Sequence, residues 1–215
     1  MAKYCIEDST LIAIGDAIRE KNGTTETMTP TEMAAAISAI EAGGNSEVEE
    51  LLAQVIEKTA TEVHNEKAER IGTMVFRNSP MQVADFPNVT EMGSYAFTGS
   101  SDLVTVNMPS LTSVVKNAFE SCSSLTKLDF PKVTSIQAYA FNSCSKLTAL
   151  ILRANRVASL ANVNALSTSL KTGSGYTYVP ADLVDNYKSA TNWSTYPDKI
   201  RAIEDYPEIC GEASA

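Results

Sequence analysis

Three copies of one 22-residue phrase follow one another without insertion through the middle of the chain, at residues 86–107, 108–129 and 130–151. Equivalent residues recur in strict register, with prolines at 87, 109 and 131, phenylalanines at 97, 119 and 141, and leucines at 103, 125 and 147. A repeat of this length is one coil that cannot bury its apolar side alone and has to stack on its neighbours. The period therefore predicts a solenoid.

Each copy ends in a short stretch in which apolar and polar residues alternate, as at 103–108 and 125–130. This alternation is typical of a half-buried strand. Because the copies stack in register, each coil is expected to add one short parallel strand to a common sheet. The outward positions of these strands then form two rows, which we expect to be Thr105, Lys127 and Ala149 in one and Asn107, Asp129 and Ile151 in the other.

The segment Ala-Phe-x-x-Cys-Ser at 118–123 and 140–145 is the most specific part of the phrase, and the first copy differs from it by carrying Ser100 in place of the cysteine. The phrase resembles the BspA-like class of leucine-rich repeats over roughly residues 75–205. The resemblance implies a short parallel-β solenoid at 72–160, with a worn partial copy at its start and a C-terminal cap at 161–215.

The four cysteines, at 5, 122, 144 and 210, form no C-x-x-C pair and no metal-ligand spacing. Cys122 and Cys144 occupy equivalent positions on adjacent coils. Strand neighbours lie about 4.8 Å apart, which is within the range that a disulfide can bridge. A reduced ladder of small apolar side chains is the favoured alternative, because a buried free cysteine packs as a small hydrophobe.

The first 44 residues carry the signals of two short helices. The first is expected at about 9–21, and the second begins at the capping box of Thr29 to Glu32 and ends at Gly43-Gly44. This helical hairpin resembles the N-terminal module of tail-associated structural proteins of phages and prophages from Firmicutes. The resemblance implies that residues 1–44 dock on other virion proteins.

A third helical run is predicted at 45–71, so that the whole chain is α+β: a hairpin, a stalk helix and a leucine-rich-repeat solenoid with a cap. Its apolar residues alternate spacings of four and three, as in a heptad seam. These residues are Val48, Leu52, Val55 and Thr59. One interpretation is a short coiled coil that makes a homo-oligomer, with a trimer as our guess; the other is a single helix that packs on the hairpin.

Composition argues against several classes of function. The net charge is −9 and no basic patch is visible, which disfavours nucleic-acid binding. No apolar run is long enough to span a bilayer and the start does not resemble a secretory signal, so we expect no membrane insertion. The only histidine, His64, lies among solvent-facing residue types, and no catalytic, phosphate-binding, cofactor or metal motif is present. We therefore expect no enzyme activity, no cofactor and no metal.

Binding remains the best-supported role. The outward residues Thr105, Asn107, Lys127, Asp129 and Ile151 form one candidate surface, because solenoids use such faces for recognition. A second candidate lies near the C-terminus, where most of the tyrosines and the only tryptophan gather between 176 and 206. There Trp193 and Tyr196 are candidates for stacking on a sugar or a partner protein. The alternative is that Tyr178, Tyr187 and Trp193 only cap the open end of the solenoid.

Together these patterns predict a non-enzymatic phage or prophage virion structural protein that displays its repeats to a host-surface protein or glycan, or to another virion protein. The predicted location is then the virion. Two alternatives remain open: a bacterial BspA-like adhesin that is surface-bound or secreted, and a virion assembly or decoration protein without a receptor.

Overall fold

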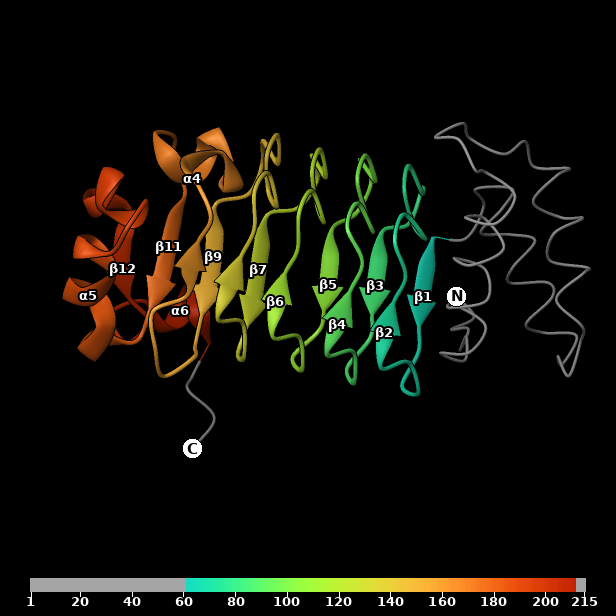
Figure 1. The fold of residues 1–215 in the computed structure, drawn as a ribbon, viewed down its shortest axis with the longest axis horizontal. Helices are drawn as coiled ribbons and strands as arrows, with labels where there is room; N and C mark the ends of the chain where they lie inside the picture. Colours follow the sequence, from blue (N-terminus) through green and yellow to red (C-terminus); the bar gives the residue numbers. More distant parts are fainter. Residues whose placement is uncertain (1–60, 212–215) are drawn as a thin grey trace, which may run out of the picture.

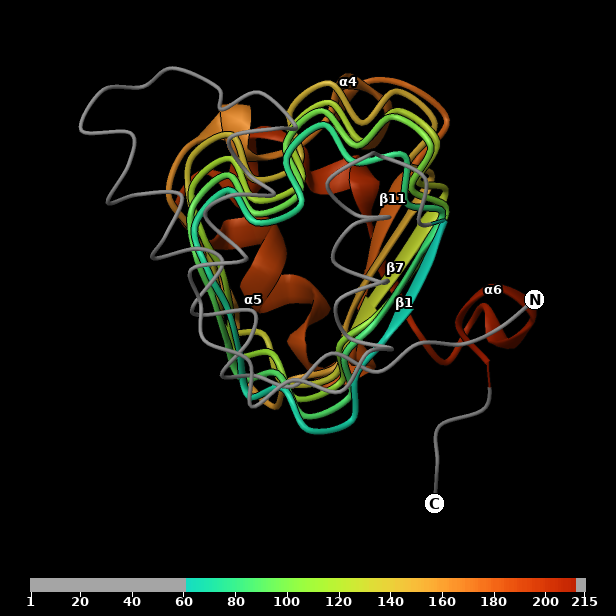
Figure 2. The same cartoon turned by 90° about the vertical axis from the view of Figure 1, so that its right-hand side faces the viewer.

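The computed structural model describes residues 61–211, which form a solenoid of stacked coils with a three-sided cross-section (Figures 1 and 2). One side is the main parallel sheet. Its strands are β1 (Glu62–His64), β3 (Val83–Asp85), β5 (Thr105–Asn107), β7 (Lys127–Phe130), β9 (Ala149–Leu152), β11 (Tyr176–Val179) and β12 (Ile200–Ala202). They pair in parallel as β1-β3-β5 and β7-β9-β11-β12, and the two groups meet where β5 and β7 lie side by side.

A second side carries one short strand from each of the first five coils, and these strands also run parallel. They are β2 (Arg70–Ile71), β4 (Glu91–Met92), β6 (Ser113–Val114), β8 (Ser135–Ile136) and β10 (Ser159–Leu160). The third side consists of turns. The predicted parallel-strand solenoid is therefore confirmed within the described residues.

The register of the main sheet reproduces the sequence period. Thr105 lies opposite Val83, and Lys127 lies opposite Ala149, so each pair is one full period apart. One coil before them, Glu62 lies opposite Val83, which is one residue short of a full period. The chain thus forms a complete coil ahead of the first strict copy, where the sequence pattern showed only part of one.

Residues 61–71 correct the predicted stalk helix, which was expected to extend to residue 71. They form β1, a turn and β2 instead. The side chain of Asn65 makes the turn, because its Oδ1 accepts the backbone N–H groups of Lys67 and Ala68 at 2.9 Å each. Val63 is fully buried as the inward residue of β1. The hairpin at 1–44 and the seam residues Val48, Leu52, Val55 and Thr59 lie outside the described residues.

The interior is built from ladders of like residues, as the repeat requires. Phe76, Phe97, Phe119 and Phe141 stack one above another, with centroid separations of 5.2, 5.3 and 6.0 Å and near-parallel rings. All four are at most 1% exposed. The ladder shows that the residue preserved in each copy is the one that touches the same residue in the next coil.

A second ladder, of polar side chains, runs beside the phenylalanines. Cys122 Sγ donates to the carbonyl of Phe97 at 3.1 Å, and Cys144 Sγ donates to that of Phe119 at 3.0 Å. Both thiols are free and buried, so the reduced ladder is confirmed. Ser100, the departure in the first copy, makes the equivalent bond to the carbonyl of Phe76 at 2.7 Å. Serine and cysteine are therefore equivalent here as hydrogen-bond donors.

Beyond residue 152 the coils continue, but helical turns replace some of the tight loops. The coil from β9 to β11 contains η1 (Val163–Ala165) and α4 (Thr168–Lys171). The last coil contains η2 (Ala181–Leu183), α5 (Val184–Ser189), η3 (Trp193–Thr195) and η4 (Pro197–Lys199) before β12. The chain then ends, within the described range, in the single-turn helix α6 (Pro207–Cys210), which lies outside the main sheet (Figure 2).

The last coil closes the open end of the apolar interior, as the capping interpretation predicts for Tyr187 and Trp193; Tyr178, the third residue of that prediction, lies instead on the outward side of the main sheet. Tyr187 and Trp193 are at most 1% exposed and meet edge to face at 5.2 Å between ring centroids. Both bind one buried residue of the coil beneath: the N–H of Ala158 donates to Tyr187 Oη at 2.8 Å, and Trp193 Nε1 donates to the carbonyl of Ala158 at 2.7 Å. Across 61–211, no helix has the length and apolar character needed to cross a membrane.

Candidate binding surface

The outer face of the main sheet brings together four of the residues that the sequence predicts for binding. Thr105, Asn107 and Lys127 are exposed, and Asp129 is partly exposed. They point outward because the intervening residues, such as Leu128, point into the core. Val104, which precedes β5, is 47% exposed at the start of this strand. We call this side of the main sheet the outer face.

The outer face over β1, β3 and β5 carries a linked polar network. The two ring nitrogens of His64 face two carboxylates, with Nδ1 in contact with Asp85 and Nε2 at 3.1 Å from Glu66. Asp85 in turn accepts from Asn107 Nδ2 at 2.7 Å. The hydrogen bond to Glu66 is the largest influence that raises the pKa of His64; burial opposes it to a smaller extent, and Asp85 adds to the rise.

The position of His64 differs from the prediction, which placed this residue in the stalk helix at 45–71. In β1, His64 occupies the same row as Asp85 and Asn107, one coil apart in each case. Two carboxylates beside a histidine favour its protonated form, and their contacts with the ring fix the side chains. The network thus gives this half of the outer face a fixed pattern of donors and acceptors.

The outer face over β9 and β11 is covered rather than open, and β7 lies at the edge of this cover. Ile151, predicted to be an exposed binding residue, is fully buried there, and this corrects the prediction. It packs in a second apolar cluster, separate from the core, whose members are Ala149, Ile151, Tyr178, Ile203 and Cys210 with Tyr176, Tyr206 and Ile209 at its margin. Residues 203–211 supply the cover, since the chain turns back from β12 across this part of the sheet.

Charged side chains border the covered half. Arg153 donates to both oxygens of Asp129, with Nη2 to Oδ2 at 2.8 Å, in a forked ion pair. This pair raises the pKa of Arg153, against a smaller effect of burial. Lys127 Nζ donates to the carbonyl of Ile209 at 2.6 Å. Two of the predicted binding residues, Lys127 and Asp129, therefore help to hold the chain's own C-terminal segment.

Trp193 and Tyr196, the second candidate binding pair, differ in exposure. Trp193 is 1% exposed and its indole N–H is bonded inside the cap, so its ring is not available for stacking on a ligand and the prediction for Trp193 is wrong. Tyr196 follows η3 and is partly exposed. The large ring of Trp193 covers apolar surface in the cap, which is the role that the sequence offered as the alternative to binding.

A cluster of tyrosines and cations stands instead at the C-terminal end of the outer face. The guanidinium of Arg201 lies 3.4 Å from the ring centroid of Tyr176 and 4.8 Å from that of Tyr206, and Lys199 lies 4.7 Å from the ring of Tyr176. Tyr178 meets Tyr206 edge to face at 5.4 Å. The signal in the sequence was the alternation Tyr-x-Tyr at 176–178, which places both rings on one side of a strand.

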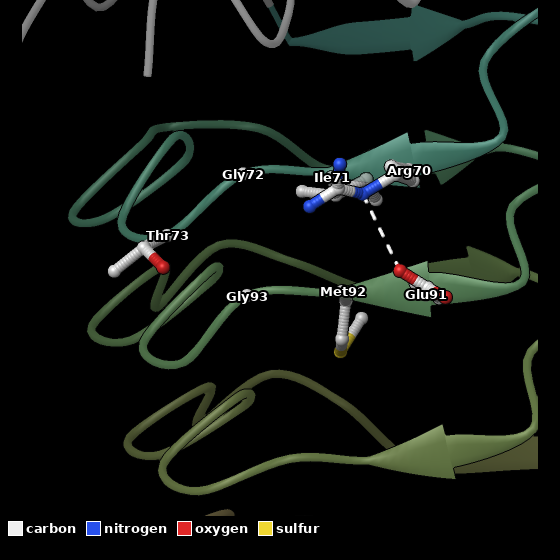
Figure 3. A pocket seen from close by; sticks show the side chains of 7 residues that line it. All are labelled: Arg70, Ile71, Gly72, Thr73, Glu91, Met92 and Gly93. Carbon is white, nitrogen blue, oxygen red and sulfur yellow. Dashed lines mark ion pairs between the residues drawn. The ribbon is translucent and has the colours of Figure 1, made fainter. Parts of the chain in front are cut away.

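A shallow groove lies on the second side of the solenoid, between β2 and β4 (Figure 3). Arg70 and Glu91 cross it as an ion pair at 3.4 Å, with side chains 60% and 70% exposed. Gly72 and Gly93 are among its lining residues. Such an exposed pair in an open groove offers neither an enclosed site nor strong binding.

Across 61–211, no three histidine, cysteine or acidic side chains gather as metal ligands. The three described thiols all have raised pKa values, with burial as the first cause, and that of Cys144 is raised to about 12. They are therefore protonated and weakly nucleophilic at neutral pH.

Comparison with known families agrees with the geometry. Residues 69–173, close to half of the chain, match the BspA type leucine rich repeat region as six copies. The match begins in the extra coil before the three strict copies and ends just after α4. No curated protein matches the chain significantly.

Proposed function

We propose that the chain is a non-enzymatic binding protein whose repeat domain recognises a partner through the open half of the outer face, over β1, β3 and β5. The observation that carries the proposal is that Thr105 and Asn107 are exposed beside the network of His64 and Asp85. Stacked coils use such faces for recognition, and BspA-type repeats suggest protein binding or adhesion.

The chemistry of this surface favours a polar protein or glycan partner. Donors and acceptors alternate across three strands and are held by one another, so little side-chain entropy is lost when a partner binds. A face of three short strands offers little area, and its affinity for one partner is expected to be modest.

For the biological setting we propose a phage or prophage virion protein that displays this face. Support comes from the N-terminal pattern at 1–44, which resembles tail-associated proteins, and from the seam of Val48, Leu52, Val55 and Thr59. A trimeric stalk would hold several faces together and multiply weak binding. The second candidate is a bacterial surface or secreted adhesin, which the BspA-type match favours. A virion assembly or decoration role without a receptor is the third.

The test uses the full chain, labelled and titrated onto a panel of Firmicutes cells and onto purified virion proteins of their phages. Thr105→Glu places a charge on the open half, and we expect it to weaken saturable binding by about tenfold or more. Thr112→Glu is the matched control, because Thr112 is also exposed but precedes β6 on the second side. Absence of saturable binding to every partner, or equal loss in both variants, would sink the proposal.

A separate measurement distinguishes the settings. An antibody against the chain is applied to purified phage particles and to the cell-wall fraction of the same cultures. Labelling of particles supports the virion proposal, and labelling of cell walls alone supports the adhesin. Light scattering of the full chain at high concentration tests the oligomer: a monomer contradicts the trimeric stalk without affecting the binding face.

A further inference from the structure

The covered half of the outer face is occupied by a C-terminal segment of the same chain. We call residues 203–211 the strap. It leaves β12, covers outward residues of β11 and β9, contacts Lys127 of β7 and ends in α6, outside the main sheet (Figure 2). The strap follows the last coil, so it adds nothing to the interior that Tyr187 and Trp193 already close.

The strap is not part of the sheet's backbone ladder beyond its first residue. The N–H of Ile203 donates to the carbonyl of Val179 at 2.9 Å. Past that bond, the backbone bonds of the strap that the structure describes are internal, for example from Cys210 to the carbonyl of Tyr206 at 2.9 Å. A single helical turn of this length has no stability of its own. The strap therefore depends on side-chain contacts with the sheet.

Those contacts are of two kinds. The first is polar: Lys127 donates to the carbonyl of Ile209, and Arg153 donates to the carbonyl of Cys210 while it binds Asp129. Carbonyl groups at the end of a helical turn lack partners within the helix and attract cations. The sheet thus binds the backbone carbonyl groups of the strap through two cations, Lys127 and Arg153, and Asp129 orients Arg153.

The second kind of contact is apolar and lies between these cations and β12. Ile203 and Cys210 of the strap are 6% and 3% exposed, and they cover Ile151 and Tyr178 of the sheet. The same outward row carries Asp85 and Asn107 in the earlier coils. The row is still polar at Asp129 in β7 and becomes apolar at Ile151 and Tyr178, which the strap covers. A change of this kind is the pattern of a binding site specialised within a repeated face.

We propose that Lys127, Ile151, Arg153 and Tyr178 form a peptide-binding site, that the strap occupies it in cis, and that its partner is a protein segment of the same chemistry. That segment is a short helical turn that presents two apolar side chains, as α6 presents Ile209 and Cys210, and free C-terminal carbonyl groups. When such a segment binds, the strap is displaced. The inference rests on the proposed function only in treating the outer face as a recognition surface.

The first experiment removes residues 205–215 and adds them back as a fluorescein-labelled peptide under reducing conditions. The truncated chain, shown to be folded by circular dichroism, is expected to bind the peptide saturably. The full chain is expected to bind at least about tenfold more weakly, because its own strap competes at high effective concentration. A folded truncated chain that does not bind the peptide overturns the proposal.

A second variant keeps the test decisive if the truncated chain does not fold. Ile209→Asp in the full chain places a charge on the apolar side of the strap, and Glu208→Ala is the matched control, because Glu208 is exposed. Ile209→Asp is expected to bind the added peptide and to raise the alkylation rate of Cys210 at least about tenfold through local opening. Peptide mapping separates Cys210 from Cys122 and Cys144, which stay protected.

The outcomes distinguish this proposal from the proposed function. Equal alkylation of Cys210 in Ile209→Asp and in Glu208→Ala, with no peptide binding in either, shows that the strap is a fixed part of the fold and overturns the inference. Cell binding that Thr105→Glu abolishes would be unaffected by that result. Conversely, peptide binding by the truncated chain would stand if no cell bound the protein.

Discussion

The cap offers the sharpest test of how the solenoid is closed, through the single hydroxyl of Tyr187. Its oxygen accepts the N–H of Ala158 at 2.8 Å, and Ala158 is fully buried. Tyr187→Phe keeps the ring that covers the interior and its edge-to-face contact with Trp193. The change therefore removes one acceptor and almost no apolar area.

The expected cost follows from what is left behind. The amide of Ala158 stays buried without its acceptor, and an unsatisfied buried donor costs about 1–3 kcal/mol of unfolding free energy. For a chain of this size, that corresponds to a melting temperature roughly 2–12 °C lower. Tyr196→Phe is the control: Tyr196 is partly exposed, and loss of its hydroxyl is expected to change stability by less than about 0.5 kcal/mol.

Urea unfolding can be followed by two signals that report different parts of the chain. Trp193 is the only tryptophan and lies inside the cap, so its fluorescence reports the cap. Far-ultraviolet circular dichroism reports the whole array of coils. Because each coil contacts only its neighbours, a weakened cap is expected to open first. The fluorescence midpoint of Tyr187→Phe should then fall below its circular-dichroism midpoint.

Equal stability of Tyr187→Phe, Tyr196→Phe and the unmodified chain, within about 0.5 kcal/mol, would refute the expectation, since the bond to Ala158 would then contribute nothing. A fall of both signals of Tyr187→Phe together, by the full amount, would refute it in part. The bond would matter in that case, but the cap would not be a separate cooperative unit.

Three further predictions concern the coils themselves. Phe119→Ala removes a fully buried rung between two stacked rings and should cost about 3–5 kcal/mol by chemical denaturation. Gly93→Ala would place a Cβ 2.3 Å from the backbone nitrogen of Thr73, so thermal melting should show clear destabilisation. Because the pKa of His64 is raised in the folded state, its protonation stabilises the fold at pH values below the unfolded pKa, and this stabilisation is lost as the pH rises through the folded pKa. His64→Gln should abolish this pH dependence in thermal melts from pH 5 to 9.

The repeat made the interior predictable. Each inward position recurs once per period, so its neighbours in space are its equivalents in sequence, and the ladders of Phe119 and Leu125 follow directly. The same logic identified Ser100 as a departure in the cysteine ladder. The structure shows that the departure is mild, because a hydroxyl donates to the same backbone carbonyl that a thiol does.

The start of the solenoid was harder to predict because a short strand has too few residues to show a period. In β1 the one inward residue is Val63, and it also fitted the helical spacing that began at Val48. The step from Glu62 to Val83 is one residue short of the period, and this slip in register hid the earlier coil. Asn65 makes the turn after β1, but an asparagine within a run of helical spacing does not by itself indicate a turn.

The covered half of the outer face was predictable only in part. Alternation correctly pointed Ile151 away from the interior, but exposure depends on whatever else lies there, and the strap comes from a segment much later in the sequence. A repeat determines contacts between neighbouring coils and says nothing about a segment outside the period. A fully apolar outward residue in a row of polar ones was the signal that something covers it.

The binding role that we propose depends on the outward row, because the inward ladders recur from coil to coil. Along that row the residues pass from His64, Asp85 and Asn107 to Ile151 and Tyr178. The core does not require this change, since outward side chains contribute nothing to the ladders beneath. The open polar half and the strapped apolar half are therefore two separate specialisations of one scaffold. We expect a substitution in one half to leave binding at the other intact, because the residues proposed for binding in the open half and those of the strap site are different.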